Sequence, residues 1–506
     1  MSDRPAQRLV AAGESLARLL ETHAWLPLGG CCAVLIWLSL RASAARPFWF
    51  DELLTFHTAR LPDFAALWLA LSRAADIQPP LFYVTTAAAQ KLFGSSEVAT
   101  RLPALAGYLL MTVCLYLFVR RRTNVLFGCV AALFPAVTEA FRYSYEARPY
   151  GLLLGFSALA LLCWQRAISA GTAGHRKFAL AGLWLSVSLA VLFHYYAVLV
   201  LIPIAIGEAV RVLRRRALDI PIAVAAGLGG LVVVVYLPLI RAGVAVHSGH
   251  PWNTVTPRLI FDAFQFALGP AAVPLAFSFV ALYPLHWLDR VAEPSAEGTG
   301  LTADETGACL GFVLLPAFGY LVGRAFTHML AERYVISLVV GFAVLFACAL
   351  SRATGGRALA GLALAAILGG TFLGRHIARP QTANPYAALT LPRQDRDLPL
   401  VMASGLDFVP QLYYGNPDVR SRMICVELAS HYHGADEVES DIGIAAPDFH
   451  WPVMRYGEFM RKYPRFFLLS RPSANWIAAK LRADGARLEF ASSQDGATLY
   501  LVTQAP

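Results

Sequence analysis

The sequence predicts a mainly α-helical protein that crosses a membrane many times and ends in a small α/β domain. Three observations predict this fold class. The 506 residues are 57% hydrophobic and only 15% charged, whereas an average soluble protein carries about 25% charged residues. Several apolar runs approach 20 residues, which is enough to cross about 30 Å of hydrocarbon. From about residue 384 the apolar runs shorten, and Pro, Asp, Asn and Ser become more frequent.

Basic clusters between the apolar runs predict the orientation of the spans. The basic N-terminus is expected in the cytoplasm, because Lys and Arg mark cytoplasmic loops. The first run, "LPLGGCCAVLIWLSL" (residues 26–40), then leads outward. We interpret it as a retained span, although "ASAA" at residues 42–45 resembles a signal-peptidase site. The next run ends in "RRR" at residues 120–122, so residues 44–97 are predicted to form a long outer loop.

Continued alternation predicts about eleven spans, with the N-terminus inside and the C-terminus outside. The runs after the first lie at residues 99–119, 125–141, 150–164, 178–193, 197–210, 220–240, 263–288, from about 307, 335–350 and 358–373. The segment "QPPLFYVTTAAAQKLFG" is short for a span. It is therefore predicted to be a helix at the membrane interface.

The composition change predicts two domains. A transmembrane domain over residues 1–380 includes the first outer loop, and a periplasmic α/β domain covers residues 381–506. In the second domain "LPLVMAS", "SRMICVEL", "RFFLLS", "RLEFASS" and "TLYLVT" are typical of strands. "SANWIAAKLRADG" is typical of a helix with a Ser cap and a Gly stop. With no GxGxxG or P-loop pattern, we expect a lid or an interaction platform and no nucleotide.

Charge and cysteine content exclude some functions. The formal charge of +9 is spread over short clusters between apolar runs. It does not form the basic, aromatic-interleaved stripe of a nucleic-acid-binding protein. Seven of the eight Cys lie in apolar runs, so we expect no disulfide framework and no CxxC metal site.

An unusual carboxylate pair follows the first span. In "FWFDE" (residues 48–52), Asp51 and Glu52 stand directly after three aromatic residues. With the predicted topology, further acids, Arg and His also fall at the outer ends of spans. Charged groups at membrane depth are costly and usually face a protein-lined cavity. They could instead cap helices within an aromatic belt, but their concentration on one face favours an active site.

Four segments, in this order, carry a family resemblance: "FWFDE", "QPPLFY", "ATRLPALAG" and "YSYEARPYGL". Together they resemble the glycosyltransferase family 39 group, which includes protein O-mannosyltransferases and lipid A aminoarabinose transferases. The resemblance covers residues 26–196 well. It implies a GT-C fold in a bacterial inner membrane. It also implies transfer of one sugar from a polyprenyl-phosphate donor to a lipid, glycan or protein acceptor at the outer face.

The resemblance assigns roles to the outer residues. Asp51 matches the catalytic acid of the family's first loop, where a carboxylate takes the proton of the acceptor hydroxyl. Glu52 is the second candidate catalytic residue. It is expected either to position the acceptor or to raise the pKa of Asp51 through like-charge coupling. The leaving phosphate needs its charge neutralised, and the candidates for binding the donor phosphate or sugar are Glu146, Arg148, Tyr150, Arg333 and Tyr334.

Two of these assignments have structural alternatives. If "YSYEARPY" is extended, Glu146 and Arg148 share one face. They then orient each other, bind phosphate, or form an ion pair that only closes the loop. The "ERY" segment that contains Arg333 and Tyr334 is also compatible with an interfacial anchor.

A divalent metal ion is the one candidate cofactor. Some family members bind such an ion near the leaving phosphate, and Asp76, Glu146 and His194 are the candidate ligands here. The family's acid or His before the paired prolines is replaced by Gln78, which is a poor zinc ligand. The sequence therefore departs from the metal-binding pattern.

Two other classes of protein compete with an enzyme. A lipid or polysaccharide transporter would carry polar residues in the middle of several spans, but here Glu208 is the nearest exception and lies close to an inner end. A non-catalytic envelope assembly protein is the second rival, and Asp51 argues against it. Within the enzymes, transfer of a whole oligosaccharide is disfavoured, because "YEARPY" replaces a DxD-like motif.

Overall fold

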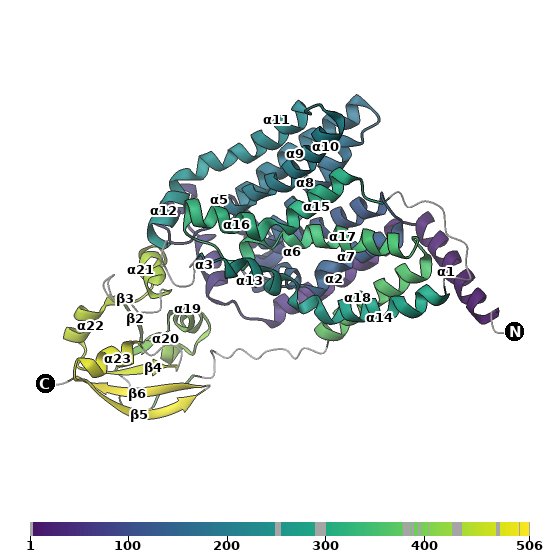
Figure 1. Cartoon of the computed structure of the whole chain (residues 1–506). Coiled ribbons are helices and arrows are strands. Elements are labelled where there is room, and N and C mark those ends of the chain that lie inside the picture. The colour runs from purple at the N-terminus through teal and green to yellow at the C-terminus, as the bar shows by residue number, and fades with distance from the viewer. Residues whose placement is uncertain are drawn as a thin grey trace. The chain divides into compact units, whose positions relative to one another are not determined.

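The computed structural model describes residues 4–247, 255–288, 300–377, 386, 389–392, 395, 397–402, 404–427, 438–471, 476–494 and 496–504. Contacts divide the chain into two compact units (Figure 1). The helical unit comprises Met1–Ala44 and Gln78–Pro380, and the C-terminal unit comprises Ala45–Ile77 and Gln381–Pro506. The first part of the predicted outer loop therefore belongs, by its contacts, to the same unit as the end of the chain.

Most helices of the helical unit are hydrophobic on nearly all sides, as buried or lipid-facing helices are, whereas α1 is amphipathic. The structure describes the α-helices of this unit from Arg4 to Ile377. They are α1 (Arg4–Thr22), α2 (Trp25–Ala45), α5 (Pro80–Phe93), α6 (Glu97–Arg120), α7 (Val125–Leu133), α8 (Tyr150–Ile168), α9 (Ala173–Phe193), α10 (Leu201–Arg215), α11 (Ile220–Leu231), α12 (Leu237–His247), α13 (Arg258–Leu268), α14 (Ala272–Leu288), α15 (Ala303–Val313), α16 (Leu315–Val322), α17 (Leu338–Ala353) and α18 (Ala358–Ile377).

These helices confirm a multi-pass membrane protein. In the described part of the chain, eight helical segments are long and apolar enough to cross a membrane. The pair Ala303–Val313 and Leu315–Thr327, bent by 51°, adds a ninth if it is one span. Two more apolar helices, Val125–Val137 and Leu338–Ala353, are shorter than a full span. Each of the predicted runs thus coincides with an apolar helix, but two of them are too short to cross by themselves.

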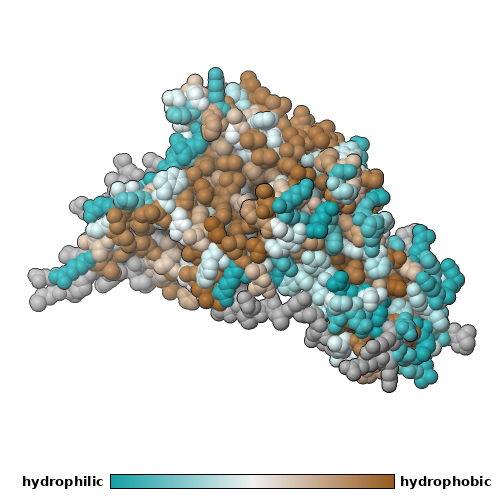
Figure 2. Space-filling view, turned by 180° about the vertical axis from the view of Figure 1, so that it is seen from behind, coloured by the Kyte–Doolittle hydropathy of each residue, from teal (hydrophilic) through white to brown (hydrophobic). Residues whose placement is uncertain are grey.

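Surface hydrophobicity agrees with this assignment. Large apolar side chains such as Phe178 on α9, Phe261 on α13 and Phe277 on α14 are exposed. On the face shown in Figure 2, hydrophobic side chains cover a broad part of the helical unit. Soluble proteins rarely expose such large apolar patches, so this surface is suited to contact with lipid.

The crossing of α6 and α8 depends on three glycines. A Cβ atom added to Gly107 would overlap the backbone of Gly151, and one added to Gly155 would overlap the backbone of Gly107. Small residues let membrane helices approach closely. The glycines of "ATRLPALAG" and "YSYEARPYGL" are thereby explained by packing, and the crossing fixes the beginning of α8.

The C-terminal unit contains a six-stranded mixed sheet with the strand order β3-β2-β1-β4-β6-β5. The first four strands in that order are parallel, and β6 and β5 are antiparallel to their neighbours. Helices provide the crossovers that parallel strands need. The elements are α3 (Phe50–Thr58), α4 (Phe64–Ser72), β1 (Leu400–Met402), α19 (Gly405–Tyr414), α20 (Pro417–Arg420), β2 (Met423–Glu427), α21 (Val438–Phe449), β3 (Val453–Arg455), α22 (Tyr456–Lys462), β4 (Arg465–Ser470), α23 (Trp476–Ala483), β5 (Arg487–Gln494) and β6 (Ala497–Thr503).

The expected α/β character of the C-terminal part is confirmed. All five predicted strands are present, and the predicted helix is α23. Its expected Ser cap lies outside the described residues, whereas Gly485 after the helix has a positive φ of 82°, as a helix stop requires. Strand β3 was not predicted, because its residues "VMR" form no apolar or alternating run, whereas the equally short β1 lies within the longer apolar run "LPLVMAS".

Candidate functional site

The carboxylate pair lies at the beginning of α3. Trp49 is the extended residue before the helix, and its backbone N–H donates to Glu52 Oε2 at 3.4 Å. This is the contact that an acid at the third helical position makes in a capping box. Glu52 is 2% exposed, whereas Asp51 is only partly buried. The structure thus gives Glu52 a helix-capping contact and leaves Asp51 the more accessible acid of the two.

Asp76 and Gln78 precede the paired prolines. The Asp76 carboxylate accepts the backbone N–H of Ile77 at 2.7 Å, and both Asp76 and Gln78 are buried. Pro79 and Pro80 then begin α5, where proline costs no helical hydrogen bond. The local contact of Asp76 is that of a turn residue.

A cluster of aromatic and basic residues lies within the helical unit. Tyr150 is the first residue of α8, and Arg333 and Tyr334 belong to a 3₁₀ turn, Glu332–Val335, before α17. Arg333 Nε donates to the Tyr150 hydroxyl at 2.9 Å. The Arg333 guanidinium lies 5.7 Å from the centre of the Tyr334 ring, and the rings of Tyr150 and Tyr334 are stacked 6.5 Å apart. Three of the predicted donor-binding residues are therefore brought together.

His194 completes this cluster from the turn between α9 and α10. Its ring centre is 5.4 Å from those of both Tyr150 and Tyr334. Burial, helped by the positive charges of Arg148 and Arg333, lowers the pKa of His194 to about 3. The imidazole is therefore neutral at physiological pH. Its Nδ1 atom accepts the backbone N–H of Tyr196 at 3.2 Å, which places the remaining proton on Nε2.

The loop before α8 carries Glu146 and Arg148, and both are buried. Glu146 Oε2 accepts from Arg142 Nε at 2.6 Å. The Arg148 backbone N–H donates to the Glu146 carbonyl at 2.7 Å, so the chain bends between them. The stretch is therefore not extended, and the condition under which Glu146 and Arg148 would share one face is not met. Pro149 and Gly151, on either side of the first residue of α8, favour a turn instead.

The cluster has the chemistry of an anion site. Arg148 and Arg333 both act electrostatically on His194, which is neutral and adds no compensating negative charge. In the described part of the chain, neither His194 Nε2 nor the Tyr334 hydroxyl has a hydrogen-bond partner. Burial also raises the pKa of Tyr334 above its usual value, so its hydroxyl keeps its proton. Guanidinium groups with neutral donors suit a phosphate oxygen.

The residues fit a metal ion less well. Among the residues that the structure describes, no three His, Cys, Asp or Glu side chains are placed to hold one. A metal on His194 Nε2 would require the proton on Nδ1, where Tyr196 N–H already donates. Glu146 is engaged by Arg142. A site built from Asp76, Glu146 and His194 remains a prediction that these contacts do not favour.

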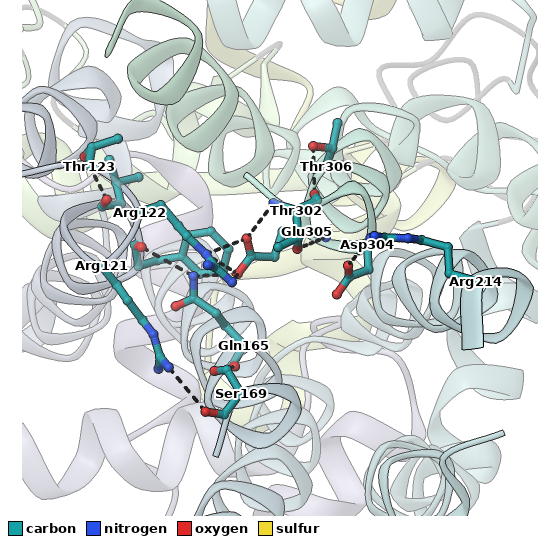
Figure 3. A network of polar contacts seen from close by, with 12 residues as sticks. Arg121, Arg122, Thr123, Gln165, Ser169, Arg214, Thr302, Asp304, Glu305 and Thr306 are labelled. Carbon is teal, nitrogen blue, oxygen red and sulfur yellow. Dashed lines mark hydrogen bonds and ion pairs between the residues drawn. The ribbon is translucent and has the colours of Figure 1, made fainter. Parts of the chain in front are cut away.

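A polar network that was not predicted from the sequence lies at the other end of α8. Tyr150 and Gln165 are separated by about 22 Å along the helix. Figure 3 shows Arg122 and Gln165 directed toward Glu305 on α15. Arg122 Nη2 and Gln165 Nε2 donate to Glu305 Oε1 at 2.8 and 2.9 Å, and the Thr302 backbone N–H donates to Oε2 at 3.1 Å. The capping-box pattern in "TADE" was the available signal for Glu305.

Glu208 also has a structural explanation. Its carboxylate accepts from Trp164 Nε1 at 2.7 Å and from Arg211 Nη1 at 2.6 Å. Arg211 in turn pairs with Asp219 at 3.2 Å. A buried acid that is paired in this way needs no transported ion to explain it.

Taken together, the fold and these clusters define a multi-pass membrane protein whose buried charges gather at helix ends. Residues 77–238 match the family model for dolichyl-phosphate-mannose-protein mannosyltransferase. A search of curated proteins finds no significant match. The chain is similar to the crystal structure of ArnT from Cupriavidus metallidurans in the apo state, with a TM-score of 0.56 and 13% identity over 93% of this chain and 97% of that one. The ArnT structure bound to undecaprenyl phosphate gives a TM-score of 0.54, with 13% identity and the same coverage, 93% and 97%.

These comparisons confirm the resemblance that the four motifs predicted. Similarity to ArnT over nearly the whole chain confirms the GT-C fold. The family match covers three of the four motif segments, from "QPPLFY" to "YSYEARPYGL". Together they support a membrane glycosyltransferase of the GT-C type.

Proposed function

We propose that this protein transfers a single sugar from a polyprenyl-phosphate donor to a lipid, glycan or protein acceptor, at the outer face of a bacterial inner membrane. The observation that carries the proposal is the cluster of buried Arg148, Tyr150 and His194 with partly buried Arg333, within a GT-C fold. ArnT, which shares this fold, binds undecaprenyl phosphate. That complex supports a polyprenyl phosphate as the lipid part of the donor.

The cluster would bind the phosphate of the donor. During transfer the bond between the anomeric carbon and the phosphate oxygen breaks, and negative charge grows on the leaving polyprenyl phosphate. Arg148 and Arg333 stabilise that charge, as cations that are already in position do for the charge that develops on a leaving phosphate. The neutral His194 and the hydroxyl of Tyr334 supply hydrogen-bond donors without a counter-charge that would compete for the guanidinium groups.

Asp51 would act as the base. The acceptor hydroxyl gives its proton to the Asp51 carboxylate while its oxygen attacks the anomeric carbon, so the configuration there is inverted. A positioned carboxylate contributes such proton transfer at a typical rate gain of about 10²–10⁴-fold. Glu52 supports Asp51 indirectly, because its carboxylate caps the helix that carries both.

The test is label transfer from a panel of radiolabelled polyprenyl-phosphate sugars in solubilised membranes. Wild-type protein should move label into lipid, glycan or protein, and Asp51→Asn should lose transfer by about 10²-fold or more. Asp63→Asn is the matched control, because Asp63 only caps α4 through Ala66 N–H at 2.8 Å and Asn caps equally well. Wild-type rates in Asp51→Asn would overturn the assignment of Asp51 as the base.

The same assay separates the rival classes. A scaffold protein would complement a deletion strain when Asp51 is Asn and would consume no donor. A transporter would move the lipid-linked sugar across the membrane without releasing polyprenyl phosphate. Consumption of donor with release of polyprenyl phosphate, dependent on Asp51, is expected only of the enzyme.

A further inference from the structure

The segment that carries Asp51 is built into the C-terminal unit. Residues Ala45–Ile77 lie more than 300 positions before Gln381–Pro506 in the chain, yet their contacts join them to that unit. Helix α3 is nine residues long, and an isolated helix of this length is marginal in water. Its order must therefore come from what it packs against.

A hydrogen bond fixes the chain directly before α3. The backbone N–H of Phe48 donates to the Tyr414 hydroxyl at 2.8 Å. Phe48 immediately precedes Trp49, the extended residue that caps the start of α3, and Tyr414 is the last residue of α19. The bond thus defines where the chain enters α3, three residues before Asp51.

Aromatic contacts hold both ends of α3. The Tyr413 ring lies 6.4 Å from Phe48 and 5.3 Å from Phe56, both as edge contacts. His57 lies 5.6 Å from Trp451, which follows α21. Such edge-to-face pairs have a preferred geometry, so they orient the helix as well as hold it. We call Phe48, Phe56, His57, Tyr413, Tyr414 and Trp451 the aromatic joint.

Two further observations strengthen the joint. Burial, with a smaller effect of the Arg60 charge, lowers the pKa of His57 to about 4, so His57 packs as a neutral ring. Beyond α4, Arg73 forms an ion pair with Asp448 of α21. The segment is therefore attached to α19 and α21 at its beginning, at the end of α3 and again after α4.

We infer that the aromatic joint positions Asp51, so that the C-terminal domain is the platform that sets the orientation of the catalytic carboxylate. The inference rests on the proposed function of Asp51. The residues of the joint are proposed as positioning residues, which act through Asp51. Weakening it should change the rate of transfer and should leave binding of the lipid phosphate in the helical unit unchanged.

Two measurements on the full-length protein test the inference. In Tyr414→Phe, hydrogen exchange of the amides of residues 48–58 should speed up by about fivefold, the size expected for the loss of one hydrogen bond. Sugar transfer should fall by a similar factor through kcat, with unchanged binding of undecaprenyl phosphate. Adding Tyr413→Ala should enlarge both effects.

Tyr456→Phe is the matched control. The Tyr456 hydroxyl also donates a hydrogen bond in this domain, to Asp484 at 2.6 Å, but it lies outside the joint. It should change neither exchange of residues 48–58 nor transfer. Its agreement with wild type separates an effect of the joint from general loosening of the domain.

The outcomes distinguish this inference from the proposed function. If Asp51→Asn abolishes transfer while Tyr414→Phe and the double variant keep wild-type exchange and kcat, the platform role is wrong and the proposed function stands. If Asp51→Asn transfers at the wild-type rate, the proposed function fails. Faster exchange in Tyr414→Phe, with unchanged kcat, would also refute positioning, because the segment would then be ordered by the joint without consequence for catalysis.

Discussion

Adjacent carboxylates in "FWFDE" have different surroundings, and this difference is clear only in the structure. Sequence reasoning placed Asp51 and Glu52 together as catalytic acids. The structure buries Glu52 and gives it the backbone N–H of Trp49, which is a capping contact. Glu52 stands three positions after Trp49, the spacing of a capping box, but Trp49 is not one of the residues that usually precede a helix. The sequence therefore offered only half of the signal.

Arg333 is the residue whose proposed role in donor binding is most directly testable. It is held by the Tyr150 hydroxyl and the Tyr334 ring. Arg333→Ala should weaken binding of undecaprenyl phosphate by about tenfold or more, since hydrogen bonds to charged groups contribute about 1.5–3 kcal/mol. Isothermal titration in detergent measures this directly. Arg324 is exposed and lies in the π-helical segment Gly323–Thr327, so Arg324→Ala should bind undecaprenyl phosphate like wild type. Equal affinity of Arg333→Ala and Arg324→Ala would contradict a role of Arg333 in phosphate binding.

Because His194 is buried and neutral, the stability of the protein should depend on pH. The native protein lowers the pKa of His194 to about 3, from an ordinary value of 6.5. Between these values the unfolded chain takes up a proton that the native site rejects, so stability falls as the pH drops from about 6.5 toward 3. His194→Gln has no imidazole to protonate at this position. Its melting temperature should therefore fall less between pH 7.5 and pH 5 than that of wild type.

The exposed His175 on α9 provides the control for this measurement. His175→Gln should keep the acid sensitivity of wild type. If His194→Gln showed the same decrease in melting temperature as wild type, the neutral, buried state of His194 would be wrong.

At the scale of elements, the close crossing of α6 and α8 determines where the Tyr150 end of α8 lies. Gly155→Ala should lower the melting temperature in detergent, because its Cβ would overlap the Gly107 carbonyl oxygen and overpacking typically costs about 1–3 kcal/mol. Gly370→Ala in α18 is the matched control, since nothing lies within 4 Å of its Cβ position. It should be neutral or stabilising. Equal melting temperatures for the two variants would disprove a crossing that depends on glycine.

The elements themselves were largely predictable. Apolar runs gave the helices of the helical unit, and β-branched and aromatic runs gave five strands of the sheet. The two features that were not predicted from the sequence have physical reasons. Strand β3 ("VMR") includes an Arg and forms no apolar or alternating run. The stretch "YSYEARPY" bends before Pro149, where the Glu146 carbonyl accepts the Arg148 N–H.

At the scale of the whole molecule, long-range partners were out of reach of sequence reasoning. The 183 positions between Arg122 and Glu305, or the several hundred between Phe48 and Tyr414, leave no mark on local composition. The order of the four motif segments was informative at this scale, because it predicted the GT-C fold without knowledge of any of these contacts. Fold class and candidate residues could thus be predicted, whereas the network of partners could not.

The Arg122–Glu305 pair predicts a stability effect that is separate from donor binding. Glu305 is fully buried, so Glu305→Gln should destabilise the protein by about 3 kcal/mol, as removal of one member of a buried pair does. Binding of undecaprenyl phosphate should persist below the melting temperature, because Glu305 lies near the far end of α8 from Tyr150. Asp304→Asn, whose partner Arg214 is exposed and 3.6 Å away, should cost less than about 1 kcal/mol. Chemical denaturation in detergent compares the two, and an equal loss in both would contradict the buried pair.

Sugar transfer at the outer face with Asp51 as the base is tested most directly by measuring transfer separately at the two faces of the membrane. A labelled polyprenyl-phosphate sugar is loaded into sealed right-side-out and inverted vesicles that contain wild-type protein or Asp51→Asn, and an acceptor-rich extract is added outside. An outer-face enzyme that uses Asp51 as its base should transfer sugar to acceptor added to right-side-out vesicles. Transfer should be lost in Asp51→Asn, and that variant should bind undecaprenyl phosphate as wild type does. Transfer at the wild-type rate by Asp51→Asn, or transfer only in inverted vesicles, would contradict an outer-face glycosyltransferase that uses Asp51 as its base.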